Sequence, residues 1–312
     1  MEGERVQIPF EEVLASLFED ETMAIHQLYR LSDMGSQESA DFHRYWSASS
    51  DERRGIIVRH LADVSEENFI VDFSPIFTLC LQDSHSPVRI AALDGLWDST
   101  DVSLVEPIIN MLENDPSTEV KVAAARSLAH FLLMSEWGQL KGADTAAIFE
   151  ALSSTYEDAL VALPVKCAAL EAMGSLTLPR VVKYFEEAFD DSVQELQLSA
   201  MFAMGISADP RWLPILLDEM ESPVTAMRAE AARASGAIGS SSAVAQLAEL
   251  IFDEDEDVAR AAITALAQIG GDDAHHSLEV LLSDSDFAHL HEAAEEAIEA
   301  WLKSDNLDDI SE

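Results

Sequence analysis

Four of the nine histidines, the side chains best suited to bind a transition metal, stand near the C-terminal end of this 312-residue sequence. His275 and His276 are adjacent, whereas His289 and His291 are two residues apart. Residues two apart in a helix face nearly opposite ways, so His289 and His291 would not hold one ion together. His291 and Glu295 have the spacing of an ordinary exposed helical pair. We therefore expect solvated surface histidines and no resident metal.

The two cysteines, Cys80 and Cys167, offer little nucleophilic or redox chemistry. Both stand in apolar, alanine-rich surroundings that are typical of small buried side chains, and two cysteines cannot form a disulfide framework. The sequence also lacks the G-x-x-x-x-G-K-[ST], G-x-G-x-x-G, C-x-x-C and G-x-S-x-G motifs. We therefore expect no catalytic centre and no cofactor, and the cysteine content suits a reducing compartment.

The charge of the chain is strongly one-sided, since 59 Asp and Glu residues stand against 18 Lys and Arg residues and give a formal net charge of −41. Nucleic acids and anionic lipid surfaces are bound through Lys and Arg, so we expect neither as a partner. No signal peptide and no membrane-spanning run is evident, which predicts a cytoplasmic protein. The acidity suits a basic protein partner or a saline host, because halophilic proteins use acidic surfaces.

An internal repeat reveals the elements that would position any functional residue. A pattern of an apolar residue, a marker that is usually basic and then an alanine three residues later recurs at gaps of 32, 45, 31, 31, 31 and 32 residues. The markers are Arg89, Lys121, Lys166, Gln197, Arg228, Ala259 and His291. At helical spacing the apolar residue and the alanine share one face. We expect this face to be buried, with the alanine allowing stacked helices to approach closely.

Each marked helix follows another apolar helix and a turn rich in Asp, Ser and Pro, residues that cap helices and form turns. In several repeats an Asp stands six residues before the marker, as Asp83 does before Arg89 and Asp115 does before Lys121. We expect these Asp and basic side chains to form a ladder that ties consecutive turns together. The 45-residue gap contains about fourteen extra residues, shared between the end of the second repeat and the turn of the third, and they predict a longer helix and an enlarged turn.

An apolar helix, an Asp/Pro turn and then V-R-x-x-A-x-x-A-L-G, on a period near 31 residues, resembles the HEAT repeat, especially the bacterial HEAT-like repeats named after phycobilisome lyases. The resemblance implies an all-α fold, an armadillo-like α-solenoid or superhelix of about seven HEAT-like two-helix repeats. It covers residues 69–303, with a helical N-terminal cap at 1–68 and an acidic tail at 304–312. Within the cap we expect helices over 10–18, 25–31, 38–46 and 51–64.

Three kinds of chemistry on this fold require residues that the sequence mostly lacks. HEAT-type di-iron hydroxylases hold iron with four His-Glu pairs, whereas this chain has one such pair, His291-Glu292. HEAT-type DNA glycosylases combine aromatics with a basic groove, but no basic stripe accompanies Trp97 and Trp212, which we interpret as packing residues of the core or of a repeat edge. The resemblance to bilin lyases rests on the repeats alone, and repeats by themselves do not transfer an activity.

Side chains two, five and nine residues after each marker project away from the buried face, onto the side that lines the concave surface in HEAT-like solenoids. Phe202 stands there between Glu171 and Arg233 along the repeats, and aromatic and arginine side chains are enriched in binding hot spots. The candidate partner-binding residues are Arg126, Glu171, Phe202, Glu230, Arg233 and Thr264. A solvated mixed-charge face with no binding role is the alternative interpretation of the same residues.

The sequence therefore predicts a non-enzymatic scaffold for protein binding, which presents a concave HEAT-repeat surface to a protein partner of unknown identity. A basic partner is favoured by the charge. We expect a monomeric, bacterial, cytoplasmic protein without a cofactor, a nucleic-acid partner or a membrane partner. The alternative is a bilin-lyase-like enzyme or cofactor carrier on the same scaffold.

Overall fold

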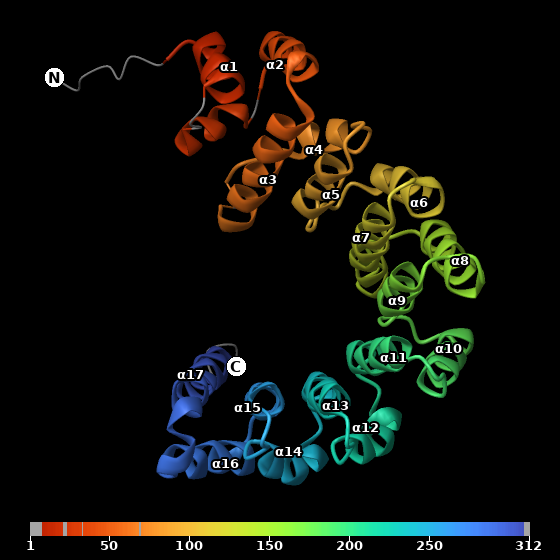
Figure 1. Ribbon diagram of the computed structural model, residues 1–312, viewed down its shortest axis with the longest axis vertical. Helices are drawn as coiled ribbons and strands as arrows, with labels where there is room; N and C mark the ends of the chain where they lie inside the picture. The colour runs from red at the N-terminus through yellow and green to blue at the C-terminus, as the bar shows by residue number, and fades with distance from the viewer. Residues whose placement is uncertain (1–7, 21–23, 33, 69, 309–312) are drawn as a thin grey trace, which may run out of the picture. The chain divides into compact units, whose positions relative to one another are not determined.

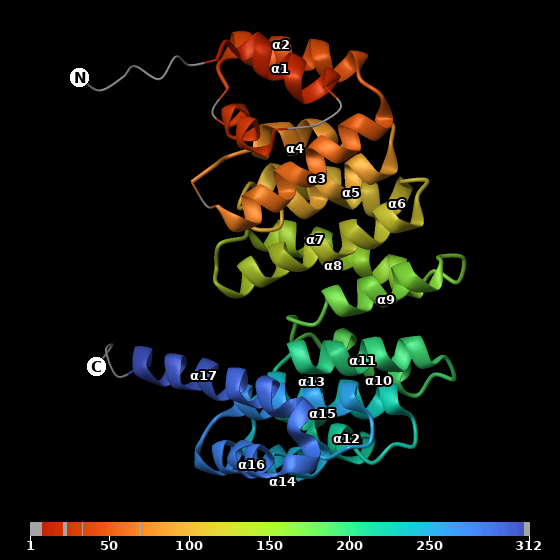
Figure 2. The ribbon, with the colours of Figure 1, turned by 60° about the vertical axis from the view of Figure 1, so that its left-hand side comes forward.

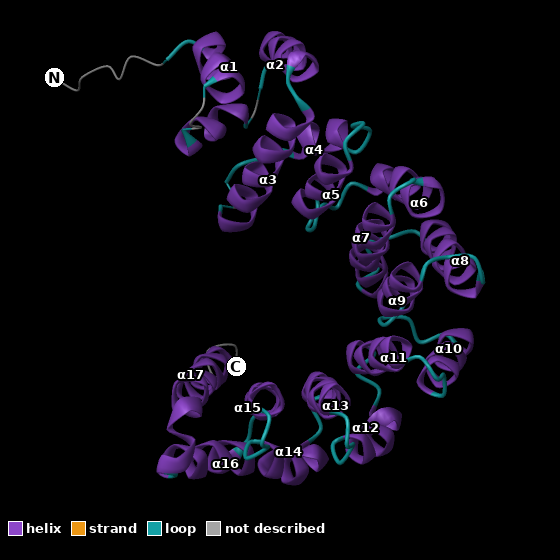
Figure 3. Ribbon diagram, viewed as in Figure 1, coloured by secondary structure: helices purple, strands orange, loops and turns teal. Residues whose placement is uncertain are grey.

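The computed structural model describes residues 8–20, 24–32, 34–68 and 70–308, with side chains up to residue 302. These residues form helices joined by turns, and no strand occurs among them (Figure 3). The fold is the all-α solenoid of two-helix repeats that the sequence predicts. None of the described helices has the combination of length and apolar character that crossing a bilayer requires.

Each of the predicted repeats is a pair of helices. The pairs are α4 (Ser74–Cys80) with α5 (Ser86–Gly95), α6 (Val105–Asn114) with α7 (Thr118–Glu136), α8 (Gly142–Glu157) with α9 (Leu163–Ala172), α10 (Pro179–Phe189) with α11 (Gln194–Ile206), α12 (Leu213–Glu219) with α13 (Thr225–Ile238), α14 (Val244–Leu250) with α15 (Glu256–Ile269), and α16 (Asp272–Ser283) with α17 (His291–Asp308). Short 3-10 helices precede four of these helices, namely η2 (Val102–Leu104), η3 (Pro210–Trp212), η4 (Ser241–Ala243) and η5 (Ser285–Leu290). Helix α7 extends over 19 residues, which confirms the longer helix. The expected enlarged turn is wrong, because residues 158–162 between α8 and α9 form a turn no longer than residues 81–85 between α4 and α5. The other extra residues lengthen α8, which has 16 residues.

The chain divides into two compact units, residues 1–155 with 160–165 and residues 156–159 with 166–312. In the first unit α3 contacts α5 and α5 contacts α7. In the second unit α11, α13, α15 and α17 contact one another in succession (Figures 1 and 2). Each unit therefore contains a layer of second helices. The first helices pack against this layer, as α12 does on α13.

The buried face of the second helices is the one predicted from the alanine column. The alanine three residues after the marker has no exposed surface in any repeat. These residues are Ala92, Ala124, Ala169, Ala200, Ala231, Ala262 and Ala294. Glycines extend the close packing, because a Cβ at Gly205 would lie 2.8 Å from Cα of Ala234 and one at Gly236 would lie 2.7 Å from Cα of Ala265. Side chains larger than hydrogen do not fit there without a shift of the next helix.

The predicted ladder of Asp and basic side chains is present, and it joins neighbouring repeats. Arg89 donates to Asp115 of the next repeat from Nε at 2.8 Å and from Nη2 at 2.7 Å. Arg228 holds Asp253 in the same way, at 2.8 and 2.9 Å. Each Asp also accepts a hydrogen bond from the backbone N–H two residues later, which fixes the turn before the second helix. Because all four side chains are nearly buried, these are buried bidentate ion pairs.

Markers other than arginine make a different contact. Lys121 donates to the carbonyl oxygen of Glu113 at 2.7 Å, and Gln197 donates to that of Phe189 at 3.1 Å. Both acceptors belong to the end of the first helix in the same repeat. A single ammonium or amide lacks the forked geometry of guanidinium, so these markers cap their own repeat instead of joining it to the next one.

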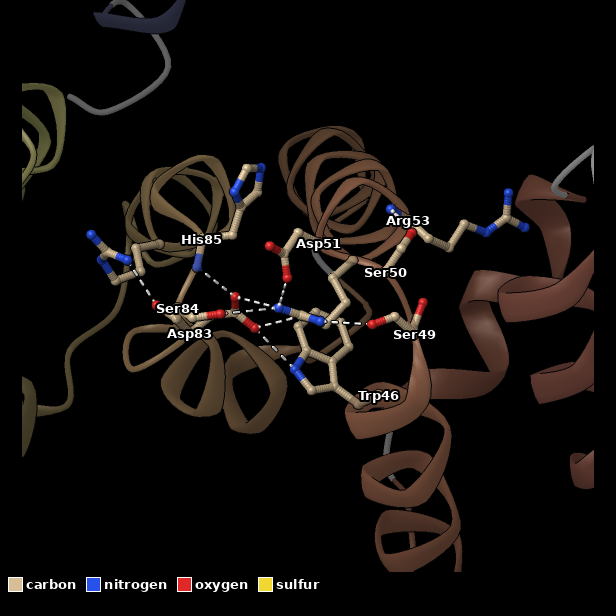
Figure 4. Close-up of polar contacts among 10 residues, drawn as sticks. Trp46, Ser49, Ser50, Asp51, Arg53, Asp83, Ser84 and His85 are labelled. Carbon is tan, nitrogen blue, oxygen red and sulfur yellow. Dashed lines mark hydrogen bonds and ion pairs between the residues drawn. The ribbon is translucent and has the colours of Figure 1, made fainter.

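A further arginine extends the ladder into the segment predicted to be a cap. Arg54 on α3 donates to Asp83 from Nε at 2.8 Å and from Nη2 at 2.9 Å, and Trp46 Nε1 donates to the same carboxylate at 3.2 Å (Figure 4). Helix α3 contacts α5 as a second helix of a preceding repeat would. The sequence pattern does not reveal this marker, because Arg53 occupies the position before it that is apolar in the other repeats.

The predicted N-terminal helices are found with small shifts of their ends. The observed elements are α1 (Phe10–Glu19), η1 (Ile25–Leu31), α2 (Ser36–Ala48) and α3 (Asp51–Glu67). The element over 25–31 is a 3-10 helix, a form that is favoured only in short segments. The domain boundary after residue 68 stays a prediction. Helix α17 includes residues 304–308 of the predicted acidic tail, and residues 309–312 lie outside the described part of the chain.

Candidate functional site

The six predicted binding residues lie on second helices but belong to two units. Those in the second unit are Glu171 on α9, Phe202 on α11, Glu230 and Arg233 on α13, and Thr264 on α15. Arg126 lies on α7 in the first unit. The structure therefore places five residues on consecutive second helices of the second unit and assigns Arg126 to the first unit. We use the name second-unit surface for Glu171, Leu198, Phe202, Ile206, Glu230 and Arg233.

Glu230 and Arg233 are the charged centre of the second-unit surface. The Arg233 Nη1 atom lies 3.2 Å from Glu230 Oε2, while Glu230 Oε1 is shielded from solvent and has no hydrogen-bond partner among the described residues. The Glu230 side chain is 14% exposed and that of Arg233 is 52% exposed. Burial raises the pKa of Glu230, Arg233 opposes this shift, and the negative charge of Glu171 adds to it. The surface thus holds a shielded carboxylate oxygen that lacks a donor.

Glu171 is fixed by a contact between repeats. Ser199 on α11 is buried, and its hydroxyl donates to Glu171 Oε1 at 2.6 Å. This hydrogen bond uses one oxygen of the carboxylate and orients the side chain toward α11. Two carboxylates of the second-unit surface are therefore held by protein contacts, one by a hydroxyl and one by a guanidinium.

An apolar stripe lies beside these charges. Phe202 and Ile206 are one helical turn apart on α11, and their side chains are 44% and 48% exposed. Leu198, one turn earlier, is partly exposed. Residues four apart share one face of a helix, so the three side chains form a continuous stripe. Large apolar residues at adjacent exposed positions are a recognised feature of binding surfaces.

A shallow groove continues from Arg233 toward the C-terminal repeats. It has a volume of about 350 Å³ between α13 and α15, and its lining includes Arg233, Arg260 and Thr264. The Thr264 hydroxyl donates to the carbonyl oxygen of Arg260 at 3.0 Å, and Arg260 pairs with Glu256 at 2.8 Å. Thr264 therefore lies in the same groove as Arg233, but its hydroxyl hydrogen is already used by the backbone.

The raised pKa of Glu230 predicts that this residue lowers stability at neutral pH. A carboxyl group whose folded pKa is above its unfolded pKa favours the folded state only while it is protonated, and that contribution is lost as the pH rises through the folded pKa. We expect Glu230→Gln to raise the free energy of unfolding at pH 7, by an amount that shrinks toward pH 4. Urea denaturation at several pH values measures the difference, with exposed Glu195→Gln as the control. A destabilising effect of Glu230→Gln at pH 7 would contradict the assignment.

Trp97 is 47% exposed and lines a groove between α5 and α7, which excludes the core and leaves packing at a repeat edge. Trp212, in contrast, is buried and packs against Phe185, as predicted. Trp97 occupies the column eight residues after the marker, where later repeats have Gly174, Gly205 and Gly236. That column packs against the next helix, so an indole there has to leave the interface. A tryptophan in a column where other repeats have glycine is the sequence signal that could have identified Trp97 as exposed.

The cysteines and histidines contribute no clustered site in the described part of the chain. Cys80 and Cys167 are buried, and desolvation raises the pKa of both thiols. A thiol with a raised pKa is a poor nucleophile at neutral pH. Among the described residues, no three His, Cys, Asp or Glu side chains gather in a way that could hold a metal ion.

The family and structural comparisons agree with the repeat architecture. A family model for HEAT repeats matches residues 212–299. The chain is similar to a solved structure, the complex of CpcE and CpcF of phycocyanin lyase from Nostoc sp. PCC7120, at 17% sequence identity. This match covers 85% of the present chain and 96% of the other, with a TM-score of 0.55.

Two other solved structures share less of the geometry. Human deoxyhypusine hydroxylase in complex with glycerol is 17% identical, with 94% of this chain and 96% of that chain covered and a TM-score of 0.37. Importin beta is 14% identical, with 93% of this chain and 46% of that chain covered and a TM-score of 0.49. None of the curated proteins compared matches the sequence. The chain thus contains HEAT repeats at residues 212–299, within a longer run of helix pairs that share one buried column.

Proposed function

We propose that this HEAT-repeat protein is a non-enzymatic scaffold that binds a protein partner on the second-unit surface. The observation that carries the proposal is the exposed stripe of Phe202 and Ile206 beside the pair of Glu230 and Arg233. An apolar stripe bordered by charges is typical of protein interaction sites, and aromatic and arginine side chains supply much of their binding energy. The second helices form the side that the sequence predicts to be concave.

The partner that suits this surface is basic. Glu171 and Glu230 place two partly exposed carboxylates on this surface, and a lysine or arginine of the partner would be attracted to them. The net charge of −41 attracts a basic protein at long range and raises its association rate at low salt. The exposed side chains of Phe202 and Ile206 would then contact an apolar residue next to that basic group.

Affinity purification of the full-length protein from its source cells tests the proposal. We expect a partner at stoichiometric level with the wild type and its loss with Phe202→Ala combined with Arg233→Glu. Loss of a hot-spot aromatic costs about 2 kcal/mol or more, so removal of two anchor residues should weaken binding by about 100-fold or more. We also expect weaker binding at higher salt, because the basic partner is steered by charge.

Val280→Ala is a matched control, because Val280 is a 43% exposed apolar residue on the first helix α16 of another repeat. Partner recovery should be unchanged with this variant. The second-unit surface would be wrong as the binding site if the purified partner bound the double variant with wild-type affinity. A partner bound equally well at low and high salt would contradict its basic character.

The alternative function, a bilin-lyase-like enzyme or cofactor carrier, has only the fold in its favour. Both cysteines are buried with raised pKa values, so neither is suited to attack an electrophile. Addition of a linear tetrapyrrole to the purified protein, followed by absorbance spectroscopy, separates the two functions. A shifted, saturable absorption band would favour the alternative. The bacterial origin, the cytoplasmic location and the monomeric state stay predictions from the sequence.

A further inference from the structure

The first unit contains a groove between its second helices α5 and α7, and the residues that line this groove differ in character from those of the second-unit surface. It has a volume of about 560 Å³. Its floor is apolar, with Ile90 and Leu93 on α5 and Val122 and Ala123 on α7. Trp97, nearly half exposed, forms part of the lining just beyond the end of α5. An apolar floor with an accessible indole can bury one or two apolar side chains of a ligand.

Arg126 lines this groove and differs from the other arginines in its lack of protein contacts. It is exposed and has no hydrogen bond or ion pair, whereas every other arginine in the described part of the chain has at least one. In a chain with 59 acidic residues, a guanidinium that forms no ion pair is an exception. Its donors are available to a ligand in the groove.

His130 lies one turn after Arg126 on the same helix, and its ring lines the groove. Its Nε2 atom is shielded from solvent and has no hydrogen-bond partner in the described residues. A shielded nitrogen is not in reach of a ligand, so His130 contributes the surface of its ring, and Arg126 supplies the hydrogen-bond donors.

The acidic residues of the groove are, in contrast, already engaged. Asp94 pairs with Arg59 of α3 at 2.7 Å. Glu119 accepts a hydrogen bond from the Ser117 hydroxyl at 2.6 Å. The remaining negative charges of the chain are screened beyond about 8 Å at physiological salt, so contacts within the groove decide which charge it prefers. The available donors at this site therefore favour an acceptor with negative charge.

We propose that this groove binds a protein segment in which an aromatic or aliphatic side chain is followed closely by a carboxylate. The apolar side chain would lie on the floor beside Trp97. The carboxylate would accept hydrogen bonds from the Arg126 guanidinium. This first-unit groove is a second binding site with the opposite charge preference to the second-unit surface, and either site can function without the other.

Selection from a phage library of random octapeptides against the full-length protein tests the charge preference directly. We expect enrichment of peptides with Asp or Glu within two residues of Phe, Trp, Leu or Ile. A parallel selection on Arg126→Glu should lose these peptides, and one on Phe202→Ala should keep them. No enrichment on the wild type, or the same acidic peptides on Arg126→Glu, would overturn the proposal.

Fluorescence polarisation with one enriched peptide, made with Glu, Gln or Lys at the acidic position, gives the affinities. We expect the Gln peptide to bind wild-type protein about tenfold more weakly, as for loss of one charged hydrogen-bonded pair. Arg126→Glu should reverse the order, so that the Lys peptide binds better than the Glu peptide. Trp97→Ala should weaken all three peptides alike, because it removes an apolar contact.

The control for charge alone is Arg260→Glu, which reverses a similarly exposed arginine on α15 of the second unit. Circular dichroism should show wild-type helicity for each variant, since Arg126, Trp97 and Arg260 are all exposed. Equal affinity for the Glu and Gln peptides on the wild type would overturn the role of Arg126. Equal weakening by Arg260→Glu and Arg126→Glu would show that net charge, not the groove, selects the peptide.

Discussion

Replacing Asp83 with alanine should lower the free energy of unfolding of the first unit by about 3–5 kcal/mol, the usual cost of removing one partner from a buried ion pair. The carboxylate accepts two hydrogen bonds from Arg54, one from Trp46 and one from the backbone N–H of His85. The Arg54 side chain is only 10% exposed, so the variant leaves a buried charge without its main counter-charge. Urea denaturation with hydrogen exchange of α3 and α5 measures the loss.

Asp94→Ala is the matched control for this prediction. Asp94 pairs with Arg59 at 2.7 Å, a distance like that of Arg54 and Asp83, but the two side chains are 45% and 47% exposed. Exposed ion pairs contribute about 0–1 kcal/mol, so Asp94→Ala should have a small effect. Equal losses for Asp83→Ala and Asp94→Ala would show that burial does not explain the strength of the ladder.

Acid should weaken the ladder at Asp83 in a defined direction. Burial alone would raise the pKa of Asp83, but hydrogen bonds from Arg54, the His85 N–H and Trp46 outweigh it and hold the pKa below its ordinary value. Such a group stabilises the folded state above its unfolded pKa, and this contribution is lost as the pH falls through the folded pKa. The stability difference between wild type and Asp83→Asn should therefore shrink on acidification below pH 4.

Gly205→Ala should destabilise the second unit by about 1–3 kcal/mol, although alanine is the better helix former. The added methyl group would lie 2.8 Å from Cα of Ala234 on the next second helix, and backbone atoms cannot move aside as a flexible side chain can. Helices α11 and α13 would have to separate, which disturbs packing along the layer of second helices. Thermal denaturation followed by circular dichroism measures the change in stability.

Gly142→Ala provides the comparison, because nothing lies within 4 Å of the Cβ position at this first residue of α8. Glycine to alanine at an unstrained position usually stabilises a protein by about 0.4–1 kcal/mol. We expect the two variants to shift the melting temperature in opposite directions. The close-packing explanation fails if Gly205→Ala is as stable as wild type.

Most of the fold follows from the repeat pattern, because a buried face on a helix fixes residue types at fixed spacing. The column of alanines identified each second helix, and the Asp six residues before Arg89 indicated the ladder. The pattern could not show that each Asp pairs with the arginine of the preceding repeat, since this depends on how helices stack. Arg54 was missed for a related reason. Only its contact with Asp83 shows that it corresponds to a marker, because the residue before it is Arg53, whereas the other markers follow an apolar residue.

Less of the candidate site could be predicted, because exposure depends on where helices end. Helix α5 ends at Gly95, so Trp97 leaves the buried column and lines a groove. The position of Phe202 five residues after its marker correctly indicated an exposed aromatic. The shielded oxygen of Glu230 could not be predicted, because its burial depends on neighbouring helices. The binding role of these residues stays a prediction.

The ladder has a consequence for how such a chain can change in length during evolution. Arg54, Arg89 and Arg228 each pair with an aspartate 25 to 29 residues later, so the repeat with Asp83 and Arg89 contributes an anion toward its predecessor and a cation toward its successor. Deletion or duplication of this complete repeat leaves an arginine opposite an aspartate at the new junction. A partial deletion would strand a buried charge, which is strongly destabilising. Copy number can therefore vary by whole repeats of this kind, while the arginine and its distant aspartate must change together.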